Sequence, residues 1–349
     1  MNNSNDTHFG DRHLLPRRAF IGKFATLSAG LLLPGCQTME TTGKPFRIDV
    51  HHHFMSPAYT AALKQYSIRP VSWTVEGTLA EMDKSGIATA LISLPPPGIT
   101  FGDVPFGRKI ARDANETAAR LVADHKGRFG SFAALPYADV EGSLAEIAYA
   151  FDTLKAQGIG LMTSYGGKLL GDPSFWPILE ELNRRKAVVY THPTTPACCA
   201  KVTPFTSINT VEGPVDTTRT MASVMFLGAA ARYPDIRWIF SHSGGVMPFL
   251  LSRFQRHEAE AKDSKEKMPN GLMHELRKFY YDTAQGNHPG ALAALMKIAP
   301  VSQVLYGTDY PFLDGAAETA GLAAYGFSGS ELQSINRDNA LRLLPRLAA

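Results

Sequence analysis

The residues with the clearest chemical potential are three consecutive histidines, His51, His52 and His53, which follow a short apolar run over 46–50. In a strand, residues i and i+2 project to the same side. His51 and His53 can therefore bind one metal ion together, while His52 faces the opposite side. Neutral imidazoles are good ligands for zinc and related divalent metals. Alone, such a pair also fits a polar loop edge, so its meaning depends on matching ligands elsewhere.

Residues of the metal-ligand type also follow three later apolar runs, at His192, His242 and Asp309. One histidine after a strand is usually structural, whereas a set at several strand ends indicates a metal centre. His51, His53, His192 and Asp309 combine imidazoles with a carboxylate and leave room for substrate, as a catalytic zinc site requires. His242 is then the general acid or base beside the metal, because an imidazole pKa can be set near neutrality. The alternative is that His242 is a fifth ligand.

Asp49 precedes these ligands on the same side of the first apolar run. A carboxylate at this depth can orient a ligand imidazole from behind. A purely structural hydrogen bond is the alternative for Asp49.

The elements that must position these residues alternate along the chain. Strand candidates are 46–50, 89–94, 129–135, 158–163, 187–191, 236–241, 279–283 and 303–307. Several are continuous apolar runs, as in buried parallel strands. Helical patterns occupy 108–126, 140–156, 175–185, 217–232 and 289–298. This alternation predicts an α/β fold, a (β/α)8 TIM barrel, whose chemistry lies at the C-terminal strand ends. An open doubly wound sheet is the alternative, but no glycine-rich phosphate loop follows the first strand.

The composition fits one large soluble domain. The chain has 349 residues, 44% of them hydrophobic, which is enough to bury a substantial core. With 35 basic and 32 acidic residues the formal charge is +3, and this near balance gives no indication of nucleic-acid binding. No internal repeat or linker interrupts residues 46–349, so we expect one domain there. The Thr- and Pro-rich stretch 193–216 predicts a long loop.

The first 45 residues have a different character. Arg17 and Arg18 precede an apolar stretch over 24–33, and Cys36 follows it. The paired arginines resemble a twin-arginine export signal, and residues 33–36 resemble a lipobox with Cys36 as the acylated residue. The apolar stretch is shorter than the roughly 20 residues of a membrane span. We expect a periplasmic protein that contacts the membrane only through a lipid on Cys36. A disordered tail with an accidental arginine pair is the alternative.

Taken as a set, these motifs resemble the amidohydrolase superfamily, and within it the amidohydrolase-related branch typified by aminocarboxymuconate semialdehyde decarboxylase. The similarity runs from about residue 46 to the C-terminus. It is carried by Asp-x-His-x-His at 49–53, His-Pro at 192–193, His-Ser-Gly-Gly at 242–245 and Gly-Thr-Asp-Tyr-Pro at 307–311. Within this branch the chain is most similar to 6-methylsalicylate decarboxylase-like proteins, on the segments 94–98, 132–136 and 191–194.

The resemblance implies non-oxidative decarboxylation of a small aromatic carboxylic acid by a homodimer without an organic cofactor. It implies one Zn²⁺ per chain, with Mn²⁺ or another divalent metal as the alternative. Two-metal relatives place a bridging lysine at the end of the fourth strand, whereas this chain has no lysine there before Lys168. His242, assisted by Asp309, would transfer the proton. Arg253 occupies the place of a family arginine that holds the substrate carboxylate from the neighbouring subunit, although an exposed ion-pairing arginine fits equally. Arg219 is a second candidate for this contact.

Two other functions remain open from the sequence. The same ligand set can activate water against a lactone or ester, as in a pyrone lactonase-like hydrolase. An exported metal- or ligand-binding protein without turnover is the third candidate, although such a protein has no need of His242 beside four ligands. Relatives of this branch work mostly in cytoplasmic catabolism, so export leaves the physiological substrate open.

Overall fold

The structure is a computed structural model, and it describes residues 46–194, 199 and 207–347, with Ile208 described by its backbone alone. The predicted export signal, with Arg17, Arg18 and Cys36, lies outside these residues and stays a prediction. No helix in the described part of the chain is long and apolar enough to cross a membrane.

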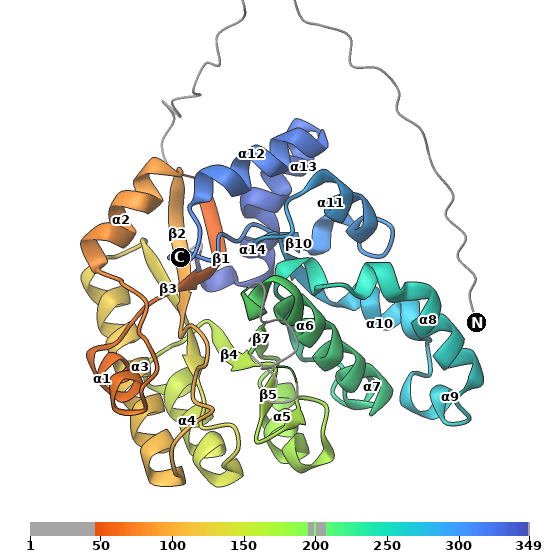
Figure 1. Cartoon of the computed structure of the whole chain (residues 1–349), viewed down its shortest axis with the longest axis horizontal. Coiled ribbons are helices and arrows are strands. Elements are labelled where there is room, and N and C mark those ends of the chain that lie inside the picture. Colours follow the sequence, from red (N-terminus) through yellow and green to blue (C-terminus); the bar gives the residue numbers. More distant parts are fainter. Residues whose placement is uncertain (1–45, 195–198, 200–206, 348–349) are drawn as a thin grey trace, which may run out of the picture. The chain divides into compact units, whose positions relative to one another are not determined.

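Eight parallel strands form the centre of the fold, and their order in the sheet follows the chain (Figure 1). They are β1 (Arg47–His53), β2 (Ile87–Ser93), β3 (Phe129–Ala134), β4 (Gly158–Met162), β7 (Val188–His192), β8 (Arg237–Phe240), β9 (Tyr280–Asp282) and β10 (Val304–Leu305). The segment after β10 returns to β1, where Asp309 N donates to His51 O at 2.8 Å and His53 N donates to Tyr310 O at 2.8 Å. The predicted (β/α)8 barrel and all eight predicted strands are confirmed.

Helices surround the strands (Figure 1). They are α1 (Pro57–Gln65), α2 (Val75–Lys84), α3 (Val104–Asp124), α4 (Val140–Asp152), α5 (Trp176–Arg184), α6 (Ile208–Phe226), α7 (Ala229–Arg232), α8 (Met247–Glu260), α9 (Ser264–Lys267), α10 (Leu272–Lys278), α11 (Pro289–Leu295), α12 (Gly315–Tyr325), α13 (Gly329–Gln333) and α14 (Asn339–Leu343). Several helices begin where a side-chain oxygen accepts a hydrogen bond from a backbone amide of the first turn that has no partner within the helix. These caps are Ser56, Thr74, Asp103, Asp139 and Asp314.

The interior of the barrel is a packed core. Inward-facing strand residues such as Val50, Leu91, Phe132 and Ile239 form one buried cluster, and Leu343 of α14 completes it. A larger cluster lies between the strands and the surrounding helices. Because side chains fill the barrel, the space for ligands lies above the C-terminal strand ends.

Two local features differ from the sequence-based expectation. The expected loop over 193–216 is wrong in its last part, because α6 begins at Ile208 and includes Pro214. Proline and threonine disfavour helix interiors, but buried Asp216 and Thr217 hold this turn against the barrel, so tertiary packing decides. A small hairpin, β5 (Ser164–Tyr165) with β6 (Lys168–Leu169), was also not expected.

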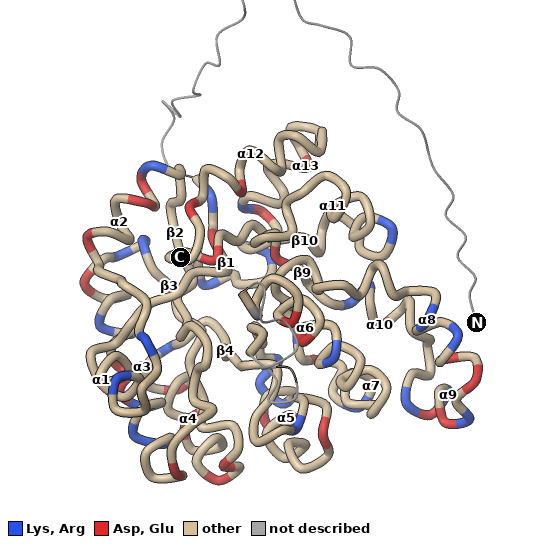
Figure 2. The backbone as a smooth tube through the Cα atoms, in the orientation of Figure 1, with Lys and Arg blue, Asp and Glu red and all other residues tan. Residues whose placement is uncertain are grey.

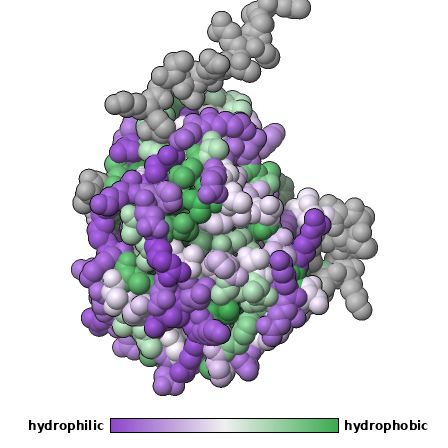
Figure 3. Space-filling model, turned by 90° about the vertical axis from the view of Figure 1, so that its left-hand side faces the viewer, coloured by the Kyte–Doolittle hydropathy of each residue, from purple (hydrophilic) through white to green (hydrophobic). Residues whose placement is uncertain are grey.

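Charged residues of both signs are interspersed along the outer helices (Figure 2). Ion pairs connect neighbouring helices, as between Arg185 and Asp152 at 2.7 Å. Such exposed pairs each contribute about 0–1 kcal/mol. The face in Figure 3 is a mosaic of hydrophilic residues with smaller hydrophobic groups between them.

Candidate metal centre

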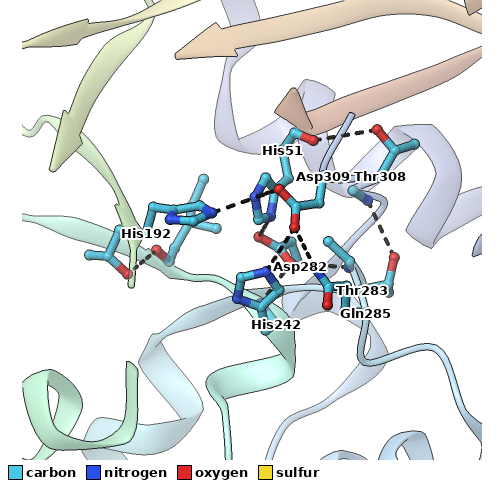
Figure 4. A network of polar contacts seen from close by, with 12 residues as sticks. His51, His192, His242, Asp282, Thr283, Gln285, Thr308 and Asp309 are labelled. Atoms are coloured by element: carbon cyan, nitrogen blue, oxygen red, sulfur yellow. Dashed lines mark hydrogen bonds and ion pairs between the residues drawn. The ribbon is translucent and has the colours of Figure 1, made fainter. Parts of the chain in front are cut away.

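The C-terminal strand ends bring together four of the residues that the sequence singled out (Figure 4). His51, His192, His242 and Asp309 offer ligand atoms that all lie within 4.8 Å of one another. His51 lies near the end of β1 and His192 ends β7, whereas His242 and Asp309 lie in the turns after β8 and β10. All four are largely shielded from solvent.

Asp309 is at the centre of the cluster, and its two oxygens face different groups. Oδ1 lies 3.1 Å from Nε2 of His51, 3.1 Å from Nε2 of His53 and 3.7 Å from Nε2 of His192. Oδ2 lies 3.4 Å from Nε2 of His242 and accepts a hydrogen bond from the Gln285 side-chain amide. One side of the carboxylate therefore faces three imidazoles, and the other faces the cavity residues His242 and Gln285.

The donor set fits a divalent metal. The three imidazoles around Oδ1 each bind a protein oxygen through Nδ1: Asp282 for His51 at 2.9 Å, the Pro193 carbonyl for His192 at 2.8 Å and Ser93 for His53 at 3.3 Å. Such outer partners fix the ring orientation and turn Nε2 toward the common point. Nε2 of His51 and of His192 is buried, and Asp309 Oδ1 is the group that faces both of them. Three imidazoles and one carboxylate are suitable ligands for zinc and for other divalent transition metals.

The pKa shifts of Asp309, His53 and His192 favour their metal-binding forms, whereas that of His51 does not. Burial lowers the pKa of His53 to about 3, although its hydrogen bond to Asp309 opposes the shift, and burial also lowers the pKa of His192. Burial acts in the same direction on His51, but the charges of Asp282 and Asp309 outweigh it and raise its pKa to about 10. For Asp309, burial favours the neutral acid, yet the charge of His51 and hydrogen bonds from the histidines hold the pKa well below its usual value. Ionised Asp309 and neutral His53 and His192 are in the forms that bind metals, whereas His51 holds a proton that a bound metal would displace.

The sequence analysis missed Asp282 at the end of β9. Its Oδ2 binds the His51 imidazole at 2.9 Å, and its Oδ1 accepts from the His242 backbone amide at 2.9 Å. Asp282 is fully buried. A signal was available, since this carboxylate ends the predicted strand 279–283 just as the other site residues end theirs. Asp282 therefore couples the position of His51 to that of His242.

Asp49 binds the imidazole of His52 and not that of a metal ligand, which fits the structural alternative for this residue. Its Oδ1 accepts a hydrogen bond from the backbone amide of His51 at 3.0 Å. Its Oδ2 lies 2.8 Å from Nδ1 of His52 and accepts from the Thr308 hydroxyl at 2.6 Å. A register shift in β1 between Asp49 and His52 brings these groups together. His52 also stacks on Tyr310, with ring centroids 4.8 Å apart. As predicted, His52 points away from the cluster, and Asp49 ties β1 to the turn after β10.

Three residues at the base of the cavity have left-handed backbone conformations. The φ angles are 55° for His242, 54° for Gln285 and 63° for Asp309. Non-glycine residues rarely adopt this region, and where they do the cost is of order 1–3 kcal/mol each. Such strained positions cluster at functional sites, and here they aim three side chains at one point.

The two candidate arginines are not brought to the cluster. The Arg219 guanidinium on α6 lies 3.5 Å from Glu212 and 3.8 Å from Asp216. Arg253 is exposed on α8. Neither residue lines the cavity above the cluster.

A cavity of about 720 Å³ opens above the cluster. His192, His242, Gln285 and Asp309 form its polar base. Its walls come from the beginnings of α6 and α8, from one face of α11 and from residues 312–313. Its size is within the range of small-molecule sites, roughly 300–1,000 Å³.

Comparison with known proteins shows the family. Residues 48–346 match the amidohydrolase family model, and the chain belongs to this family. It is 36% identical over 327 residues to the decarboxylase YanB of Aspergillus niger, covering 86% of this chain and 88% of that protein. It is 33% identical over 314 residues to 6-methylsalicylic acid decarboxylase of Penicillium expansum, covering 86% and 97%. The resemblance seen in the sequence motifs is confirmed.

Solved structures share the fold. An amidohydrolase II crystal structure superimposes with a TM-score of 0.80 at 25% identity, covering 86% of this chain and 99% of that one. A dihydroxybenzoic acid decarboxylase from Polaromonas sp., solved with bound manganese, gives a TM-score of 0.72 at 22% identity, covering 86% and 97%. In this chain, the histidine and aspartate cluster is a donor set that could hold a divalent metal.

Proposed function

We propose that this chain is a metal-dependent decarboxylase of small aromatic carboxylic acids, of the hydroxybenzoate or 6-methylsalicylate type. The observation that carries the proposal is the convergence of His51, His53, His192 and Asp309 beside His242, at the base of a ligand-sized cavity. Relatives at 31–36% identity over most of the chain are named decarboxylases, among them two 6-methylsalicylic acid decarboxylases.

We infer that His51, His53, His192 and Asp309 hold one divalent ion, and that the ion is zinc. Imidazole and carboxylate ligands with one open position are typical of catalytic zinc; manganese, present in a protein of the same fold, is the alternative. When bound, the ion supplies Lewis acidity toward a carboxylate or phenolic oxygen of the substrate.

His242 is the residue placed to transfer a proton. Its imidazole lines the cavity, its Nε2 lies 3.4 Å from Asp309 Oδ2, and its backbone amide is held by Asp282. In the proposed reaction, His242 gives a proton to the ring carbon that bears the carboxylate, and a C–H bond forms there. The bond from this carbon to the carboxylate then breaks, carbon dioxide leaves, and the electron pair restores the aromatic ring. Asp309 orients the imidazole by accepting its hydrogen bond.

A substrate panel tests the proposal directly. The metal-loaded protein is incubated with 6-methylsalicylate, 2,6-dihydroxybenzoate and a pyrone lactone, and carbon dioxide and organic products are quantified. We expect equal amounts of carbon dioxide and phenol from at least one acid. Opening of the lactone, with no carbon dioxide from either acid, would show that the site is hydrolytic.

We also propose a homodimer in which Arg253 acts on the cavity of the second copy. Arg253 is exposed on α8 and does not line the cavity of its own chain, so only another copy can bring it to a substrate. Arg253→Ala should raise KM for an acid substrate. In mixed dimers of an Arg253→Ala chain and a His242→Ala chain, one of the two sites should be active. A monomer in sedimentation would contradict the proposal.

We further propose export by the twin-arginine signal and attachment through Cys36. Arg17, Arg18 and the apolar stretch 24–33 support the signal, and residues 33–36 support lipidation. Replacing both arginines by lysine should retain the protein in the cytoplasm. Cys36→Ser should move it from the membrane fraction to the soluble periplasmic fraction. Cytoplasmic wild-type protein would contradict export.

A further inference from the structure

The cavity is larger than one aromatic ring requires. Its volume is about 720 Å³, whereas an apolar cavity of about 150 Å³ accepts a benzene molecule. A single-ring acid seated at the polar base would leave most of this space unused. The chemistry of the walls indicates what fills it.

Beyond the base, the described lining residues carry no charge. They are apolar on α8, on α11 and at residues 312–313, and polar at the start of α6, where Ser207, Asn209 and Thr210 lie. The ionisable groups among the described lining residues are His192, His242 and Asp309, all at the base, and neither lysine nor arginine is among these lining residues. Phe312 and Leu313 line the cavity while 44% and 37% exposed, and Phe249 at the rim is 89% exposed. The Phe312 ring meets the His53 ring edge-on at 5.7 Å, so the apolar wall begins directly beside the cluster.

Helix α11 supplies a wall of small residues. Gly290, Ala291 and Ala294 line the cavity, whereas Leu292 and Leu295 of the same helix are fully buried in the core. The helix therefore turns its large side chains inward and leaves space on its cavity face. Burial of apolar surface by a ligand there is favourable by about 25 cal/mol per Å².

We propose that the cavity accepts aromatic monocarboxylates with an uncharged apolar extension larger than a methyl group, such as a propyl or pentyl chain or a second fused ring. This inference rests on the proposed function, since it takes the carboxylate end of the substrate to lie at the polar base. The extension lies between the small face of α11 and the pair Phe312 and Leu313. A second carboxylate on the extension should bind less well than an alkyl group there, because it would give up hydration without gaining a cationic partner among the described lining residues.

A homologous series tests the inference with the full-length, metal-loaded protein. Dissociation constants and kcat/KM are measured for 6-methyl-, 6-propyl- and 6-pentylsalicylate. We expect affinity and kcat/KM to rise about fourfold for each added methylene, the equivalent of about 0.8 kcal/mol. A chain that ends in a carboxylate should bind at least about tenfold more weakly than an alkyl chain of equal length.

Variants of α11 test where the apolar extension of the substrate binds. Ala294→Leu fills the cavity face, and Ala291→Leu does so at a more exposed position in case the first variant is unstable. Ala293→Leu is the matched control, because Ala293 is exposed on the same helix and does not line the cavity. We expect the gain with chain length to disappear in the first two variants and to persist in the control.

The outcomes separate the two proposals. If 6-methylsalicylate is decarboxylated and longer acids bind no better, the inference is overturned and the proposed function stands. The same holds if Ala293→Leu and Ala294→Leu change chain-length dependence equally. If no acid releases carbon dioxide, the proposed function is wrong, and the inference is then tested by the dissociation constants alone. Tighter binding with chain length supports the apolar site, and equal or weaker binding overturns it.

Discussion

At the scale of single residues, Asp309 organises the site because its two oxygens have separate partners. Oδ1 faces the imidazoles of His51, His53 and His192, whereas Oδ2 faces His242. A cation at Oδ1 would thus leave Oδ2 free to orient the proton donor. The ligand atom of His242 is nevertheless within 4.8 Å of those of His51 and His192, so its role must be separated from theirs by experiment.

Alanine variants make this separation. His192→Ala should reduce bound metal by at least tenfold, because it removes one of four ligands. His242→Ala should retain most of the metal and lose at least about 100-fold in kcat, the usual contribution of a positioned acid or base. Metal content is measured by elemental analysis beside kcat. Loss of metal in both variants would identify His242 as a fifth ligand.

Asp282 should control metal affinity without touching the metal. Asp282→Asn removes the charge that holds His51 through Nδ1, and changes to such outer partners typically cost 10–100-fold in metal affinity. Asp49→Asn is the control, since Asp49 binds the imidazole of His52 and contacts His51 only at its backbone amide. Competition with a metallochromic chelator gives both affinities. Equal metal affinities in the two variants would show that Asp282 does not control metal binding.

At the scale of elements, the residues before and after the strands position most of the side chains of the site. The strands were predictable because buried parallel strands are continuous apolar runs, and the ligands were predictable because they follow those runs. The start of α6 at Ile208 was not predictable, because Pro214 and several threonines disfavour a helix that only tertiary burial stabilises. The contacts of Asp49 depend on a register shift in β1, which no local pattern reveals.

The contact of α12 with the turn after β9 should make stability depend on pH. Glu318 accepts a hydrogen bond from the Gln285 backbone amide at 2.9 Å, and its second oxygen is buried without a hydrogen-bond partner in the described structure. Burial, together with the charges of Asp282 and Asp49, raises the Glu318 pKa from 4.5 to about 8, against the opposing effect of the Gln285 hydrogen bond.

Between these pKa values the unfolded chain releases the Glu318 proton while the folded chain keeps it. The stability contributed by this group is therefore complete below about pH 4.5 and is lost as the pH rises through 8. Glu318→Gln should flatten the fall in unfolding free energy between pH 5 and pH 8, as measured by urea denaturation. Parallel curves for variant and wild type would contradict the assignment.

The turn after β8 should not tolerate a side chain at Gly245. Its φ is +66°, and an added Cβ would lie 2.0 Å from the Pro214 carbonyl oxygen of α6. Gly245→Ala should destabilise the fold by more than about 3 kcal/mol, since it combines backbone strain with overpacking. Gly326→Ala is the control, with φ of +88° and open space around the Cβ, and should cost about 1–2 kcal/mol. Equal losses in thermal denaturation would show that the contact with α6 can relax.

At the scale of the whole molecule, barrel closure creates the site. The metal ligands and the proton donor His242 come from β1, from β7 and from the turns after β8 and β10, which meet only when the segment after β10 returns to β1. Strand order along a barrel made their convergence predictable from the sequence. The cavity walls were not predictable, because α11, α8 and residues 312–313 are brought together by the fold and share no sequence motif.

The central claim is that the cluster at the barrel mouth holds a metal needed for decarboxylation. The most direct test removes metal with a chelator, restores zinc or manganese stepwise, and measures carbon dioxide and phenol released from 6-methylsalicylate at each occupancy. We expect no release from the stripped protein and a rise in proportion to metal, reaching its maximum at one ion per chain. Release that is unchanged in the stripped protein, or absent at full occupancy for every hydroxybenzoate tried, would contradict the account.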